Sequence, residues 1–143
     1  WWNAVVAADF DRDGDVDYVA GNLGLNSKYK ASPAQPVRLY AGDFDENGRL
    51  DPVLTYFLEG KETLAPTRDV ATDQMTVLMR KRFTSYTAYA RATVDDVLGD
   101  RKADARVLKA TEMRSCLIEN LGGGKFNLKP LPLPAQIAPV FGI

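Results

Sequence analysis

Two short acidic segments of the same pattern are the feature that most constrains how this chain can fold. Residues 9–17 read DFDRDGDVD, and residues 43–51 read DFDENGRLD. Both fit the pattern D-x-[DN]-x-[DN]-G-x-x-D, and apolar, strand-like residues precede and follow each of them. Internal repetition of a strand–loop–strand unit predicts an array of similar β units.

The chemistry of the two segments predicts calcium binding. Carboxylates held close together repel one another unless a cation lies between them. Calcium takes about 6–8 oxygen ligands, and a short loop can supply side-chain oxygens from positions 1, 3, 5 and 9 and a main-chain carbonyl from position 7. We therefore predict two Ca²⁺ sites. Their ligands are Asp9, Asp11, Asp13, Asp15 and Asp17 in the first, and Asp43, Asp45, Asn47, Arg49 and Asp51 in the second, with Asp15 and Arg49 acting through main-chain carbonyls.

Details of the pattern refine this prediction. Gly14 and Gly48, at position 6, allow the sharp turn with positive φ that such a loop needs. Asn47 keeps an oxygen but drops one charge, so we expect the second site to bind more weakly. An EF-hand would carry a bidentate Glu at position 12 between two helices. Ala20 and Leu54 stand there instead, and the flanks are rich in β-formers, so the loops are not EF-hands.

Composition excludes several classes of protein. The chain has 143 residues, 45% of them apolar, a formal net charge of −1 and no histidine. A general nucleic-acid binder would carry excess positive charge, and insertion into a membrane would need a run of about 20 apolar residues. The absence of histidine removes the commonest general base and the usual zinc ligand. The lone Cys116 cannot form an internal disulfide, and we expect it to be a small buried apolar residue.

The two loops resemble those of FG-GAP or VCBS β-propeller repeats, the calcium-loop blades also found in integrin α-subunit heads. Residues 120–126 add a second family feature, because they fit N-x-G-x-G-x-F, a β-turn followed by the last strand of a blade. The segments GNLGLNSKYK and RFTSYTAYA resemble large bacterial VCBS-repeat surface proteins. The resemblance implies a mainly β fold of propeller blades, each an antiparallel four-stranded sheet, with residues 138–143 as the opening strand of another blade.

The middle of the chain departs from that family pattern and predicts a two-helix insertion. An apolar stripe at helical spacing indicates the first helix. A second helix is expected from about Ser85 to a cap at Gly99. The residues expected to face inward are Met75, Leu78, Met79 and Phe83 in the first helix, and Tyr86, Ala90, Val94 and Val97 in the second. We expect the insertion to pack on a blade, with a partner-binding face as the alternative.

We predict a single domain over residues 1–143, built as a fragment of a propeller. Residues 1–60 would form a blade region with both calcium loops, 61–100 the helical insertion, and 101–143 the closing blade strands and the start of the next blade. Propellers close with about 4–8 blades, which two loops cannot supply. We therefore expect a piece of a longer protein whose open blade edges pair with another chain, giving an oligomer.

Two functions remain open. The first is a calcium-binding interaction module of a larger extracytoplasmic protein, binding a protein or carbohydrate partner. The second is a purely structural domain that supports a catalytic neighbour. A magnesium-dependent phosphatase with Asp9 as nucleophile and Asp11 as acid/base fits poorly, because Asp13 replaces the expected Thr or Val and the second loop would have no role. We predict no catalytic residues. Millimolar calcium favours a secreted, periplasmic or cell-surface location.

Overall fold

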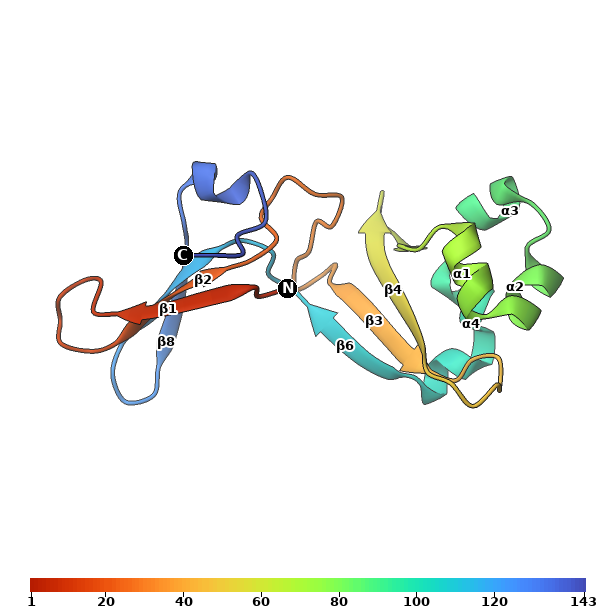
Figure 1. Cartoon of the computed structure of the whole chain (residues 1–143), viewed down its shortest axis with the longest axis horizontal. Helices are drawn as coiled ribbons and strands as arrows, with labels where there is room; N and C mark the ends of the chain where they lie inside the picture. The colour runs from red at the N-terminus through yellow and green to blue at the C-terminus, as the bar shows by residue number, and fades with distance from the viewer. The chain divides into compact units, whose positions relative to one another are not determined.

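The computed structural model describes residues 1–143 and contains two four-stranded antiparallel sheets with short helices (Figure 1). The chain forms two compact units: Trp1–Tyr29 together with Glu112–Ile143, and Lys30–Thr111. The prediction of a mainly β fold with antiparallel four-stranded sheets is confirmed. Neither sheet closes on itself, because each has two edge strands. The two calcium loops, expected in one region of residues 1–60, lie in different sheets.

The first unit is built on strands from both ends of the sequence. Its sheet has the order β1-β2-β7-β8. The strands are β1 (Ala4–Ala8), β2 (Asp17–Gly21), β7 (Cys116–Asn120) and β8 (Phe126–Pro130), followed by the 3-10 helix η2 (Leu133–Gln136). The turn predicted at residues 120–126 joins β7 to β8, with Asn120 opposite Phe126 and the Asn120 side chain accepting a hydrogen bond from Gly122 N–H at 3.0 Å.

Buried polar side chains hold the first unit together beside its sheet. Asn22 and Ser115 are fully buried, and Gln136 is 3% exposed. Ser115 Oγ accepts a hydrogen bond from Asn22 N–H at 3.0 Å, and Ser115 N–H donates to Gln136 Oε1 at 2.9 Å. Gln136 Nε2 donates to the carbonyls of Ser115 and Leu131. These bonds satisfy groups that would otherwise be costly to bury, and they fasten η2 to the sheet.

The segment after η2 forms no strand, so the expected opening strand of a next blade at residues 138–143 is absent. The segment instead meets the end of β2, where Val140 N–H donates to the Asn22 carbonyl at 3.0 Å. A Cβ on Gly21 would lie only 2.6 Å from the Val140 carbonyl oxygen. The close approach therefore depends on glycine, and it places this segment against β2 without forming a ladder.

The second unit combines a sheet with all the α-helices. Its sheet has the order β5-β4-β3-β6. The strands are β3 (Val37–Gly42), β4 (Asp51–Leu58), β5 (Lys61–Leu64) and β6 (Arg106–Ala110). The helices between β5 and β6 are α1 (Arg68–Gln74), α2 (Thr76–Arg82), α3 (Tyr86–Ala90), α4 (Val94–Leu98) and the 3-10 helix η1 (Gly99–Asp104).

The prediction of a two-helix insertion is wrong, because each expected helix is broken in two. Met75 separates α1 from α2 with the non-helical angles φ −125° and ψ 60°. Thr93 restarts the chain as the N-cap of α4, where it forms a capping box with Asp96. The predicted end of the segment is confirmed: α4 ends at Leu98, and Gly99 follows with φ 57°.

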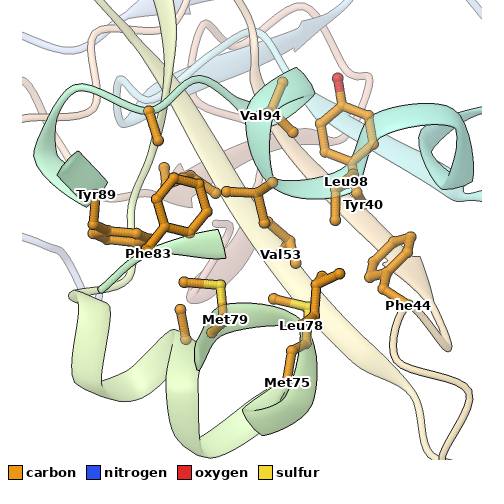
Figure 2. Packing of buried hydrophobic residues seen from close by; sticks show 14 residues of the cluster. Tyr40, Phe44, Val53, Met75, Leu78, Met79, Phe83, Tyr89, Val94 and Leu98 are labelled. Carbon is orange, nitrogen blue, oxygen red and sulfur yellow. The ribbon is translucent and has the colours of Figure 1, made fainter. Parts of the chain in front are cut away.

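The apolar core lies between these helices and the second sheet (Figure 2). The predicted stripe of the first expected helix is confirmed, since all four of its residues are at most 8% exposed. In the second expected helix Val94 and Val97 are buried, but Tyr86 and Ala90 are exposed. The break after α3 changes the helical phase, and Tyr89 turns inward instead, packing edge-on against Phe83 at 5.7 Å between ring centroids.

A polar cluster crosses the second sheet at Glu62. Its carboxylate accepts hydrogen bonds from Arg38 (2.6 Å), Tyr40 (2.9 Å) and Thr55 (2.7 Å). Burial raises the pKa of Glu62, but these three donors outweigh it and hold that pKa below its ordinary value of 4.5. The cluster therefore joins β3, β4 and β5 through one ionised carboxylate.

Candidate metal centres

Each acidic segment forms the loop of a β-hairpin, as the sequence predicts. The first loop connects β1 to β2, whose residues Ala8 and Asp17 face each other across the pair. The second connects β3 to β4, with Gly42 opposite Asp51. In both loops the aspartate at position 9 is the first residue of the following strand. The sheet therefore fixes one end of each candidate site.

The two loops also adopt the same backbone turn. Gly14 and Gly48, at position 6, have φ values of 96° and 81°, as expected. Position 4 also has positive φ in both loops, 66° at Arg12 and 60° at Glu46. Residues other than glycine rarely occupy this region, and neither Arg12 nor Glu46 is a residue type that predicts it. Two independent segments thus share an uncommon conformation at corresponding positions.

Three hydrogen bonds recur in both loops. The side chain at position 1 accepts from the N–H of position 6, position 5 accepts from position 7, and position 9 accepts from position 2. In the first loop the pairs are Asp9 with Gly14 (3.2 Å), Asp13 with Asp15 (2.8 Å) and Asp17 with Phe10 (3.1 Å). In the second they are Asp43 with Gly48 (2.8 Å), Asn47 with Arg49 (2.8 Å) and Asp51 with Phe44 (2.8 Å). The oxygen-bearing side chains therefore turn inward in both loops.

This arrangement gathers three carboxylates at each loop. One oxygen from each of positions 1, 3 and 9 lies within 4.8 Å of the others, in the groups Asp9, Asp11 and Asp17, and Asp43, Asp45 and Asp51. At position 5 of the first loop, the predicted ligand Asp13 lies outside its group. The role of Asn47 at position 5 of the second loop stays a prediction. The main-chain contributions of Asp15 and Arg49 stay predictions.

The carboxylates at position 9 are deeply buried, which makes their charge costly. Asp17 is fully buried and Asp51 is 2% exposed. Burial raises the pKa of Asp51, and the nearby carboxylates of Asp45 and Asp43 raise it further. A divalent cation between these groups would remove that repulsion and favour their ionised forms.

The donor set passes a simple test of fit for a hard cation. Every side-chain ligand offered by the two loops is an oxygen, which suits Ca²⁺ or Mg²⁺ and not zinc or copper. Asp45 Oδ1 is buried and has no hydrogen-bond partner in the chain. A buried polar atom without a partner is rare in folded proteins, and a bound ion is one accepted explanation. The residues present therefore fit such an ion.

The surroundings of the loops differ in ways that the sequence did not indicate. Asp17 Oδ1 accepts a second hydrogen bond, from Asn120 N–H at 2.8 Å, which joins the first loop to β7. Asn120 Nδ2 also donates to the Val16 carbonyl at 3.2 Å. At position 2, Phe10 is 46% exposed whereas Phe44 is 2% exposed and belongs to the apolar core (Figure 2). The second loop is therefore packed into its unit more tightly than the first.

Cys116, Arg82 and Trp1 lie outside the two loops and make packing, hydrogen-bonding or stacking contacts within their own units. Cys116 is fully buried, and burial raises the pKa of its thiol, as expected of a residue that packs as an apolar side chain. Arg82, in the basic segment of α2, donates to the carbonyls of Asp96 and Val97 and so ties α2 to α4. Trp1 stacks on Tyr29 with 5.2 Å between ring centroids.

No helix of this chain has the length and apolar character needed to cross a bilayer. Comparison with models of known protein families, with curated protein sequences and with solved structures finds no match.

Proposed function

We propose that this chain is a calcium-binding structural and interaction module of a larger extracytoplasmic protein, built from blades of the FG-GAP or VCBS propeller type. One observation carries the proposal: two loops of the same pattern, in separate sheets, share a backbone turn with uncommon φ values and three hydrogen bonds. Each loop also gathers three carboxylate oxygens within 4.8 Å. Two acidic surface loops without a shared function would not be expected to have the same φ values and the same three hydrogen bonds.

Calcium suits these loops better than magnesium. Magnesium demands near-ideal octahedral geometry and keeps several of its waters, whereas calcium accepts a flexible shell of carboxylates and carbonyls. Each loop offers three convergent carboxylates, an oxygen at position 5 and a carbonyl at position 7. Such a ligand set supports calcium binding at the millimolar concentrations found outside the cytosol.

The residues would act by holding the hairpins in shape. Calcium would supply two positive charges at each loop, and two ions would change the formal net charge from −1 to +3. Asp17 and Asp51 are the first residues of β2 and β4, so an ion bound to their carboxylates would stabilise each loop together with its sheet. An ion present at about one hundred times its dissociation constant adds about 2.7 kcal/mol to the free energy of unfolding.

Exposed apolar side chains on edge strands support the interaction role. Val5 on β1 is 67% exposed, and Phe126 and Leu128 on β8 are 50% and 47% exposed. Open strand edges with apolar residues favour contact with another chain. We propose a protein or carbohydrate partner, or oligomerisation through these edges, and no catalytic role.

Thermal unfolding of the purified chain tests the proposal. We expect calcium to raise the midpoint relative to chelator, magnesium to do so far less, and Asp11→Ala and Asp45→Ala each to remove part of the calcium effect. Asp104→Ala is the matched control, because Asp104 is exposed and lies outside both loops. Equal midpoints in calcium and in chelator would overturn the proposal.

A further inference from the structure

We propose that Gln74, the last residue of α1, is a ligand of the second calcium site, so that the ion joins the helices of this unit to the β3–β4 hairpin. The inference rests on the proposed function, because it names an additional residue for one of the two loops. Gln74 lies outside the nine-residue pattern, so the repeat itself does not predict this role.

A hollow between loop and helix brings the relevant residues together. It has a volume of about 380 Å³. Asp45, Asn47 and Asp51 line it from the loop and the start of β4, and Asp73, Gln74 and Thr76 line it from the junction of α1 and α2. The break between these two helices at Met75 therefore places the amide of Gln74 and the carboxylate of Asp73 beside the loop.

Two unpaired oxygens mark this hollow. In the whole chain, residues 1–143, the buried side-chain oxygens or nitrogens without a hydrogen-bond partner are Asp45 Oδ1 and Gln74 Oε1. Both belong to residues that line this one hollow. Two acceptors cannot satisfy each other, because neither carries a proton to donate when Asp45 is ionised. A cation bound in this hollow would give both oxygens a partner, and amide and carboxylate oxygens are ligands that calcium accepts.

The charge around the hollow also favours a bound cation. Asp43, Asp45, Asp51 and Asp73 bring four carboxylates to this region, and the lining includes one cationic side chain, Arg49. A further carboxylate ligand would add repulsion before the ion binds. The neutral amide of Gln74 adds an oxygen without adding charge.

The first loop has no extra side-chain ligand comparable to Gln74. Asp11, which corresponds to Asp45, is exposed, and its Oδ1 accepts a hydrogen bond from Asp13 N–H at 3.2 Å. No buried side-chain oxygen of the first loop is without a partner. We therefore expect the second site to bind calcium at least as tightly as the first, which reverses the order expected from Asn47 alone.

Calcium titration by calorimetry tests this role with one site at a time. Asp11→Ala leaves the second site to be measured, and Asp45→Ala leaves the first. We expect Gln74→Met to weaken binding about tenfold in the Asp11→Ala background, because it removes one oxygen ligand, and to leave binding unchanged in the Asp45→Ala background. Gln74→Glu keeps an oxygen at this position and should bind calcium more tightly than Gln74→Met. Gln35→Met, at an exposed glutamine, is the matched control.

Stability in chelator separates ligation from a structural role. Without calcium, Gln74→Met removes an unpaired buried oxygen and should unfold at the same midpoint as the wild type or higher, whereas with calcium it should unfold lower. Equal affinities for Asp11→Ala with and without Gln74→Met would overturn this inference and leave the proposed function standing. Absence of calcium binding in the wild type would instead overturn the proposed function.

Discussion

The carboxylate of Asp17 closes the first loop through two backbone hydrogen bonds, which gives a prediction that does not depend on calcium. Its Oδ2 accepts from Phe10 N–H at 3.1 Å and its Oδ1 from Asn120 N–H at 2.8 Å, and the residue is fully buried. In Asp17→Asn one oxygen becomes an NH₂ group, which cannot accept a hydrogen bond. One backbone N–H then faces another donor. We expect the free energy of unfolding to fall by about 1–3 kcal/mol, the cost of leaving a buried polar group unpaired.

Urea unfolding in calcium-free buffer measures this loss. With an m-value of about 2 kcal/mol per molar urea, the midpoint should fall by roughly 0.5–1.5 M. Asp15→Asn makes the same chemical change at an exposed side chain of the same loop and should leave the midpoint nearly unchanged. If Asp17→Asn unfolds at the same urea concentration as the wild type, these two bonds do not hold the loop to the sheet.

Three further substitutions test the second unit by urea unfolding. Leu98→Ala, at a fully buried side chain, should lower the free energy of unfolding by about 2–5 kcal/mol. Leu58→Ala, at a side chain that is 53% exposed, should lower it by about 0.5 kcal/mol or less. Similar losses in the two variants would contradict the described core. Gly48→Ala should lower the free energy of unfolding by about 1–2 kcal/mol, because the φ of 81° is strained for alanine. Gly142→Ala should be neutral, because Gly142 has no positive φ; at both positions a Cβ would meet open space. Glu62 has a lowered pKa, so it contributes stability above pH 4.5 that is lost as the pH falls below 4.5. Glu62→Gln should flatten that acid-side loss, and an unchanged slope would argue against the cluster.

Local pattern was enough to predict the hairpin loops and their convergent oxygens. Alternating aspartates on a turn of fixed geometry place positions 1, 3 and 9 on one side, and the structure brings those carboxylates together in both loops. The positive φ at Arg12 and Glu46 was not predictable, because neither residue type favours that region. It follows from the closure of the whole loop and not from the residue at position 4.

Contacts between distant segments were beyond the sequence alone. β2 pairs with β7 across about a hundred residues, and neither strand carries a signal that names its partner. The break in the helical segment at Met75 was likewise not indicated by the local sequence pattern. Met75 fits a helical stripe by spacing, yet its backbone leaves the helix and places Gln74 beside the second loop. The hydrophobic period identifies a buried face but does not show where a helix stops.

We propose that the chain binds two calcium ions, one at each acidic loop. Counting bound calcium by equilibrium dialysis at millimolar free calcium tests it most directly. We predict two ions per wild-type chain and one per chain in both Asp11→Ala and Asp45→Ala. A wild-type chain that binds no calcium under these conditions, or two single variants that retain two ions each, would contradict the account.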